Sequence, residues 1–294
     1  MPALFYLSGE KKMKYYLYYI RANRHILILT LLICVFIDLC IVVADLPNAG
    51  VKGFWIPVLI ALGLTVLVMG FLLIVIFCFY IKSRSELEIM DKSGVCEELI
   101  QAYKHNHPRP NSVNRLVLAS YYMALERLEE AERELTIVGA SIMTDMSVKG
   151  LYSELFVSMR IHQHRFDEAI LMYKNYENVM EVYCRSHKNA LNIEHYANGA
   201  VLYACSGNFE AAMECIRRSE KAVKKERYLA FTRNTALMSV YLLAGDYAKA
   251  DEIKNMMFRD LETFNGFPLG GHKKLAYKDI ADAQKLYDPR VQTQ

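Results

Sequence analysis

The chain has 294 residues, of which 53% are hydrophobic and 23% are charged, and its formal net charge is +3. A net charge this small, without a Lys/Arg run interleaved with aromatic residues after residue 82, argues against nucleic acid as a partner. The seven cysteines form no Cys-x-x-Cys pair, so they predict neither a disulfide framework nor a metal site.

Two long apolar runs, residues 26–44 and 56–80, predict a two-helix transmembrane hairpin over residues 26–80. Asp38 in the first run costs roughly 2.5 to 3.5 kcal/mol at the bilayer centre, but each Ile, Leu, Val or Phe around it returns about 0.3 to 0.6 kcal/mol, so insertion remains favourable. The second run contains no charged residue, and its length implies a tilted helix. The short connection between the runs contains turn-forming residues, namely Pro47, Asn48, Gly50 and Gly53.

The basic residues that precede the first span predict the orientation of the hairpin. They lie in a juxtamembrane segment, residues 1–25, that also carries tyrosines at 15, 16, 18 and 19; the basic residues are Lys11, Lys12, Lys14, Arg21 and Arg24. A signal peptide is the competing interpretation, but this basic segment is too long for one and a second span follows. By the positive-inside rule, we expect an integral protein of the plasma membrane with both termini and everything after residue 80 in the cytoplasm.

An intramembrane carboxylate such as Asp38 is either a proton or ion site or a hydrogen-bonding group between helices. The short connection places Asp38 level with residues 63–65 of the second run, where Gly63 and Gly70 share one face and predict a close helix approach. Two helices enclose no cavity, which favours an interhelical hydrogen bond. The same bond between two copies of the hairpin would produce a homo-oligomer, and that alternative stays open.

Residues 81–110 are expected to form a linking helix and a hinge. The helical pattern continues out of the second span to His105, and the segment with Pro108 and Pro110 stops it. Asn111 or Ser112 then caps a new helix.

A short pattern centred on alanine recurs four times within residues 111–264. A bulky residue stands three positions before each alanine, and an apolar or aromatic residue stands four or seven positions after it. The last two copies also contain a glycine, Gly207 or Gly245, at the point where a pair of helices would turn through a left-handed residue. The alanines are Ala131, Ala169, Ala212 and Ala250, and the bulky residues are Leu128, Phe166, Phe209 and Tyr247.

These residues resemble the tetratricopeptide repeat, in which small residues let two antiparallel helices cross closely. The resemblance covers about residues 111–258 and implies an α-solenoid of about four helical pairs whose inner groove binds a protein or peptide segment. The early Trp and the closing Pro of that family are missing, and the alanine spacings of 38, 43 and 38 residues exceed the family period of about 34. We therefore expect longer helices or longer loops than the family has.

Residues 265–294 should form a loop and a C-terminal capping helix. The loop spans residues 265–271, and a helix over about 273–287 would place an apolar stripe over the last repeat: Leu275, Ile280, Ala283, Leu286 and Tyr287. No strand or hairpin pattern occurs, so the predicted fold class is all-α, a transmembrane hairpin followed by a TPR-like α-solenoid and its capping helix.

The motifs that carry catalysis are missing from the sequence. It contains no phosphate-binding loop, nucleophile elbow or His-Glu-x-x-His motif, so we predict neither catalytic residues nor a cofactor. Two His-x-His pairs occur, His105 with His107 and His162 with His164. Side chains two positions apart on a helix diverge by about 200°, so neither pair predicts a metal site.

The inner groove implied by the resemblance is apolar and weakly acidic. Relatives that bind chaperones hold a terminal carboxylate with Lys, Asn and Arg, and of these only Asn198 has a counterpart here. Such a groove is either open to a partner or filled by the terminal helix or by tight curvature, and the sequence leaves both open. The predicted groove residues are Leu116, Val117, Ser120, Leu151, Glu154, Leu155, Ser158, Asn198, Val201 and Thr235.

Together these features predict a membrane-anchored cytoplasmic scaffold or adaptor that binds a protein partner through its repeats, and not an enzyme. The alternative is an accessory or regulatory subunit of a membrane enzyme or transporter complex, with Asp38 in its membrane part. A polar group opposite Asp38 in a larger bundle would favour the alternative, and an isolated hairpin would favour the scaffold.

Overall fold

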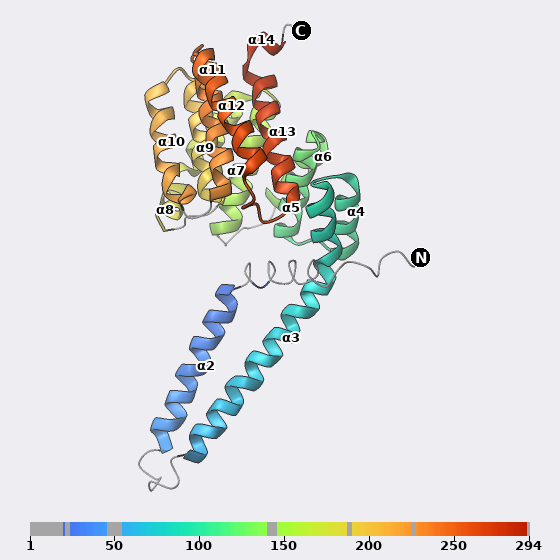
Figure 1. Ribbon diagram of the computed structural model, residues 1–294, viewed down its shortest axis with the longest axis vertical. Helices are drawn as coiled ribbons and strands as arrows, with labels where there is room; N and C mark the ends of the chain where they lie inside the picture. Colours follow the sequence, from blue (N-terminus) through green and yellow to red (C-terminus); the bar gives the residue numbers. More distant parts are fainter. Residues whose placement is uncertain are drawn as a thin grey trace. The chain divides into compact units, whose positions relative to one another are not determined.

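The computed structural model describes residues 20, 24–45, 55–139, 146–186, 190–224 and 227–292. These residues form helices joined by short connections, and no strand occurs among them, which confirms the all-α prediction (Figure 1). The chain divides into two compact units, Met1–Glu88 and Ile89–Gln294. The predicted juxtamembrane tyrosines and the turn-forming residues between the two apolar runs lie outside the described residues.

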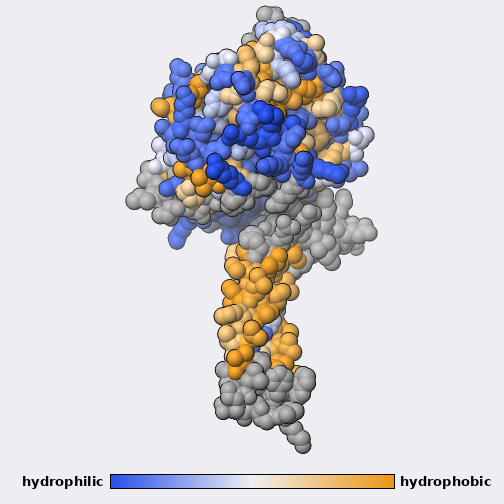
Figure 2. Space-filling model, turned by 90° about the vertical axis from the view of Figure 1, so that its left-hand side faces the viewer, coloured by the Kyte–Doolittle hydropathy of each residue, from blue (hydrophilic) through white to orange (hydrophobic). Residues whose placement is uncertain are grey.

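The first unit contains helix α2 (Arg24–Asp45) and most of helix α3 (Trp55–Ser93). Apolar side chains cover the surface of both helices (Figure 2), and on α3 the side chains of Val66 and Phe71 are 71% and 68% exposed. Among the described residues, α3 is the one helix that is long and apolar enough to cross a membrane, whereas the apolar part of α2, Ile26–Cys40, is shorter. The second span therefore has the expected length and composition, and the first span stays a prediction.

A hydrogen bond joins α2 to α3 at the level predicted from the sequence. The Thr65 hydroxyl donates to the Asp38 carboxylate, with 2.5 Å between Oγ1 and Oδ2. The predicted interhelical hydrogen bond is therefore present. The predicted close approach at Gly63 and Gly70 is wrong, because a Cβ atom built on either glycine would meet nothing within 4 Å.

The linking helix is interrupted earlier than the sequence pattern predicted. Helix α3 ends at Ser93, and Gly94 follows with a φ of 76°, a left-handed conformation that terminates a helix. A separate helix, α4 (Glu97–Asn106), then runs to the predicted hinge. The next helix, α5 (Ser112–Ala124), is capped by Asn111, whose side chain accepts a hydrogen bond from the backbone N–H of Asn114.

Four pairs of neighbouring helices follow in the described part of the chain, and the first helices of successive pairs pack against one another (Figure 1). The first helices of the pairs are α5, α7 (Met146–His162), α9 (Ala190–Cys205) and α11 (Ala230–Leu243), which the short 3-10 helix η1 (Arg227–Leu229) precedes. The second helices are α6 (Leu128–Gly139), α8 (Phe166–Ser186), α10 (Phe209–Val223) and α12 (Tyr247–Thr263).

The recurring alanines lie where the helices of each pair cross. Ala131, Ala169 and Ala212 are fully buried and Ala250 is 1% exposed, as the pattern predicted. Five positions before each alanine, the chain passes through a left-handed residue at the turn between the two helices of the pair. In chain order these residues are Glu126, His164, Gly207 and Gly245, with φ values of 58°, 56°, 75° and 75°.

The C-terminal helix begins three residues earlier than predicted. Helix α13 (Gly270–Tyr287) packs against α11 and α12, and the short α14 (Pro289–Gln292) follows it. Ile280, Ala283 and Tyr287 of the predicted stripe are buried together with Ala276, while Leu275 and Leu286 are only partly buried. The stripe is therefore turned slightly about the helix axis from its predicted position.

Candidate functional site

The first helices of the pairs, α5, α7, α9 and α11, form one side of the stack, and we call this side the inner face. Helix α13 packs on this side, against α11. Val157 and Ile161 of α7 and Val201 of α9 share one core cluster with Ile280 and Tyr287 of α13. Helix α13 packs directly against α11 and α12 of the last pair, as predicted for a cap. The terminal helix thus fills the part of the inner face that α11 forms.

Four of the predicted groove residues are buried: Leu116, Glu154, Leu155 and Val201. Leu116 and Leu155 belong to a second core cluster, which also contains Ile100 of α4 and Leu135 of α6. These two leucines fill the space between neighbouring helices, so the prediction that they face a ligand is wrong. Val201 does face inward, but α13 covers it.

The other six predicted groove residues are partly exposed: Val117, Ser120, Leu151, Ser158, Asn198 and Thr235. The Ser120 hydroxyl donates to the backbone carbonyl of Val117 in its own helix, at 2.7 Å. The Thr235 hydroxyl approaches the sulfur of Met257 in α12 at 3.8 Å. Ser120 and Ser158 therefore remain the small, partly exposed positions of the inner face on α5 and α7.

A buried polar network connects α7, α8 and α9 at the inner face. The Glu154 carboxylate lies 2.8 Å from Nδ1 of His195 and accepts a hydrogen bond of 2.9 Å from the side-chain amide of Asn198. With a proton on Nδ1, the His195 Nε2 atom accepts from the Tyr173 hydroxyl at 3.4 Å, and the two rings stack. Burial raises the pKa of Tyr173, which keeps its hydroxyl neutral and able to donate.

This network satisfies a carboxylate that would otherwise be costly to bury. Glu154 is 2% exposed and His195 is 1% exposed, so each needs its partner inside the protein. Glu154 and Asn198 were predicted from the sequence as groove residues, whereas His195 was not, although it lies three positions before Asn198 on the same face of α9. Tyr173 is the aromatic residue four positions after Ala169 in the repeat pattern, which predicts packing and not a polar contact.

Two further carboxyl groups of the inner face have strongly raised pKa values. Desolvation, together with the nearby charges of Glu154 and Asp279, raises the pKa of Glu194 on α9 to about 7. Desolvation and the charge of Asp282 raise the pKa of Asp279 on α13 to about 7, although this residue is exposed at the surface. A basic group, Lys278, opposes the rise at Asp279. The charge of Asp279 on α13 thus acts on Glu194 of α9.

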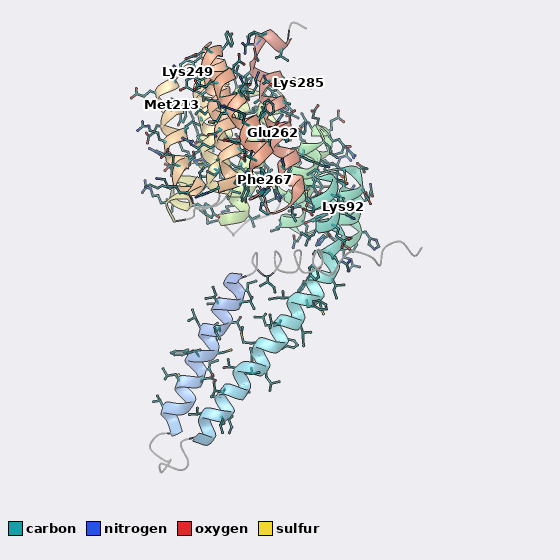
Figure 3. All side chains as sticks on the ribbon, in the orientation of Figure 1. Lys92, Met213, Lys249, Glu262, Phe267 and Lys285 are labelled. Carbon is teal, nitrogen blue, oxygen red and sulfur yellow. The ribbon has the colours of Figure 1, made fainter. Side chains whose placement is uncertain are left out.

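The N-terminus of α13 is attached to the last turn of α3. The backbone N–H of Gly270 donates to the Asp91 carboxylate at 2.6 Å, and the Lys274 ammonium donates to the backbone carbonyl of Lys92 at 2.7 Å. A Cβ atom on Gly271 would lie 2.1 Å from the Met90 carbonyl oxygen, so only glycine fits at this contact. We call this contact the latch; it consists of Met90–Gly94 and Gly270–Lys274. Figure 3 labels Lys92 on α3 and Phe267 in the loop that leads into α13.

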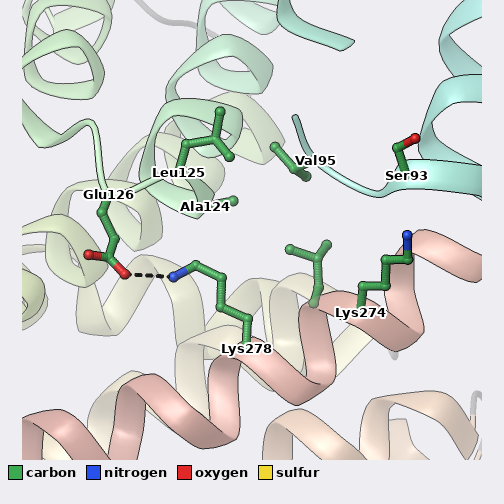
Figure 4. Close-up of a pocket in the computed structure, with 8 residues that line it drawn as sticks. Ser93, Val95, Ala124, Leu125, Glu126, Lys274 and Lys278 are labelled. Atoms are coloured by element: carbon green, nitrogen blue, oxygen red, sulfur yellow. Dashed lines mark hydrogen bonds and ion pairs between the residues drawn. The ribbon is translucent and has the colours of Figure 1, made fainter. Parts of the chain in front are cut away.

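Ion pairs continue from the latch along α13. Glu126, the left-handed residue of the first pair, accepts a hydrogen bond of 2.9 Å from Lys278 (Figure 4). Its carboxylate also lies 3.7 Å from the Lys285 ammonium. Beside these residues lies a cavity of about 300 Å³. The residues that line it are Ser93, Val95, Ala124, Leu125, Glu126, Lys274, Leu275 and Lys278.

The other end of α13 is held through α14. Arg290 forms ion pairs with Asp288 and with Asp251 of α12, and its guanidinium lies over the Tyr247 ring, 4.6 Å from the centroid. Asp288 is 1% exposed, and the bonds from Arg290 lower its pKa. Both ends of α13 therefore have defined partners.

No group of three or more His, Cys, Asp or Glu residues is placed to hold a metal ion in the part of the chain that the structure describes. His107 instead contacts the side-chain amide of Asn114, and His164 adopts the left-handed conformation at a turn. No protein-family model, curated protein or solved structure matches the chain.

Proposed function

We propose that this chain is a membrane-anchored cytoplasmic adaptor, in which a two-helix transmembrane hairpin holds a TPR-like α-solenoid that binds a protein segment on its inner face. The observation that carries the proposal is the combination of α3, an apolar helix with exposed side chains, with stacked helical pairs in the same chain. Exposed apolar side chains along such a helix are costly in water and are favourable in a bilayer.

The Asp38 contact supports the adaptor over an accessory subunit of a transporter. Asp38 has a hydrogen-bond donor, Thr65, within the same hairpin. A carboxylate satisfied inside its own hairpin does not require a larger bundle to accommodate it. The inner face supports the binding role, because a set of parallel first helices that accepts one helix, α13, has the shape and apolar surface to accept another.

Site-specific photo-crosslinking in intact cells tests the binding role. A photoreactive phenylalanine analogue at Ser120 or Ser158 should give adducts with a second protein, because both are predicted groove positions and both are partly exposed. The same analogue at Leu171 or Val182 serves as the control, since these α8 side chains are 63% and 66% exposed and lie away from the inner face. Equal adduct yields at all four positions, or none at Ser120 and Ser158, would contradict the proposed binding face.

A further inference from the structure

The apolar side of α13 has the pattern of a helical ligand. Ala276, Ile280, Ala283 and Tyr287 follow one another at intervals of four, three and four residues, which places them on one stripe of the helix. All four are buried, and Ile280 is fully buried. An amphipathic helix that lays such a stripe into an apolar face is one of the recurring ways in which proteins recognise peptides.

Helix α13 depends on the latch for its first turn. Its N-cap residue, Leu269, makes no side-chain capping bond, and the first turn contains no acidic residue. Asp91 of α3 instead accepts the hydrogen bond from the Gly270 N–H and supplies the negative charge that favours a helix N-terminus. Opening of the latch therefore removes the cap of α13 at the same time.

The remaining contacts of α13 include weak and unfavourable ones. Lys278, Lys285 and their partner Glu126 have side chains that are 30%, 72% and 55% exposed, and ion pairs between such solvent-exposed side chains stabilise a protein little. The charge of Asp279 on α13 contributes to the raised pKa of Glu194 on α9, so it disfavours ionisation of that carboxyl group. The non-helical loop Phe264–Leu269 separates α13 from α12, so α13 can leave without unwinding α12.

We propose that α13 is an intramolecular ligand of the inner face, and that the partner of this chain is an amphipathic helix that takes the place of α13 when the latch opens. This inference rests on the proposed adaptor function and adds the class of partner and the event that admits it. The latch includes the last residues of α3, so the helix that carries the apolar segment also holds the occupant of the binding face.

Gly271→Ala in the full-length protein, purified in detergent micelles, opens the latch. The new methyl group cannot be accommodated 2.1 Å from the Met90 oxygen. Gly63→Ala is the matched control, because a Cβ there meets nothing within 4 Å. Lys274→Ala is a milder second variant that removes only the bond to the Lys92 carbonyl and guards against misfolding of the first.

Hydrogen exchange followed by mass spectrometry measures the opening. In the wild type, the amides of α13 should exchange through a local opening that leaves α9 and α11 protected. Gly271→Ala should speed exchange in α13 by about tenfold or more, as expected for a contact worth over about 1.4 kcal/mol, without a change in α9 or α11. Exchange of α13 at the rate of α11 in the wild type and in both latch variants would show an integral core helix and overturn the proposal.

A fluorescent synthetic peptide that covers residues 269–292 measures access to the inner face. It should bind Gly271→Ala at least about tenfold more tightly than the wild type or Gly63→Ala, and a scrambled peptide should not. An opened variant that fails to bind the peptide would also overturn the proposal.

The two proposals can fail separately. Peptide binding to the opened variant without any intermolecular photo-adduct in cells would leave α13 as a ligand and refute the adaptor function. Intermolecular adducts at Ser158 in a protein whose α13 never opens would refute the inference and leave the adaptor function standing.

Discussion

Small side chains are buried in the core clusters that join the two helices of each pair. The four alanines at the helix crossings are between 0% and 1% exposed. Gly199 on α9 shows the same crowding, because a Cβ there would lie 2.2 Å from the Tyr173 hydroxyl. Close helix packing in this protein therefore depends on small residues at a few positions.

Ala250→Leu should destabilise the protein by about 1 to 3 kcal/mol, because added methyl groups at a packed crossing force neighbouring side chains out of their rotamers. Thermal unfolding of the purified protein would show this as a fall in Tm of several degrees. Ala248→Leu on the same helix is the control, since Ala248 is exposed. Equal Tm values for the two variants would mean that Ala250 does not lie at a tight crossing.

At the scale of the helical pair, one backbone conformation recurs at every turn. Each turn passes through a left-handed residue five positions before the crossing alanine. Glycine adopts this conformation without strain, whereas residues with a side chain pay roughly 1 to 2 kcal/mol. The last two turns have glycine, while the first two have Glu126 and His164.

At the left-handed turn position, replacing glycine should lower stability, whereas introducing glycine should leave stability unchanged or raise it. Gly245→Ala should cost about 1 kcal/mol through strain alone, because a Cβ at Gly245 meets no atom within 4 Å. His164→Gly should leave stability unchanged or raise it by up to about 1 kcal/mol. Denaturant unfolding of both variants checks the prediction, and a loss of stability in His164→Gly equal to that in Gly245→Ala would contradict it.

At the scale of the whole molecule, the distribution of basic residues predicts that both chain ends lie on the cytoplasmic side. This prediction implies that the proposed partner of the helical pairs is a cytoplasmic protein. A reversed orientation would place the same inner face outside the cell and change the class of partner available to it.

Cysteine labelling checks the orientation in a background in which the exposed Cys40 and Cys78 are replaced by alanine. Asn48→Cys should react with an impermeant thiol reagent on intact cells, because residue 48 lies between the two predicted spans. Gln294→Cys should react only after the cells are permeabilised. Labelling of Gln294→Cys alone on intact cells would reverse the proposed topology. Both positions lie outside the described residues.

Features that depend on short stretches of chain were predictable from the sequence. Apolar runs predicted α3, the alanine spacing predicted the helical pairs, and Asn111 and Gly207 marked a cap and a turn correctly. Such signals are readable because helix periodicity, capping and left-handed turns involve residues within a few positions of each other. The break at Gly94 was also locally encoded, but a helical pattern on both sides concealed it.

The side chains and the helix that occupy the inner face could not be predicted from the sequence. Leu116 and Leu155 lie between helices because the rotation of each helix about its axis is set by its neighbours, and periodicity does not specify that angle. The bond from Gly270 to Asp91 joins residues 179 positions apart, and the network of Glu154, His195 and Tyr173 joins three helices. The position of α13 follows from its packing against α11 and its bonds to the end of α3, which are contacts between segments far apart in the chain that no short segment of sequence contains.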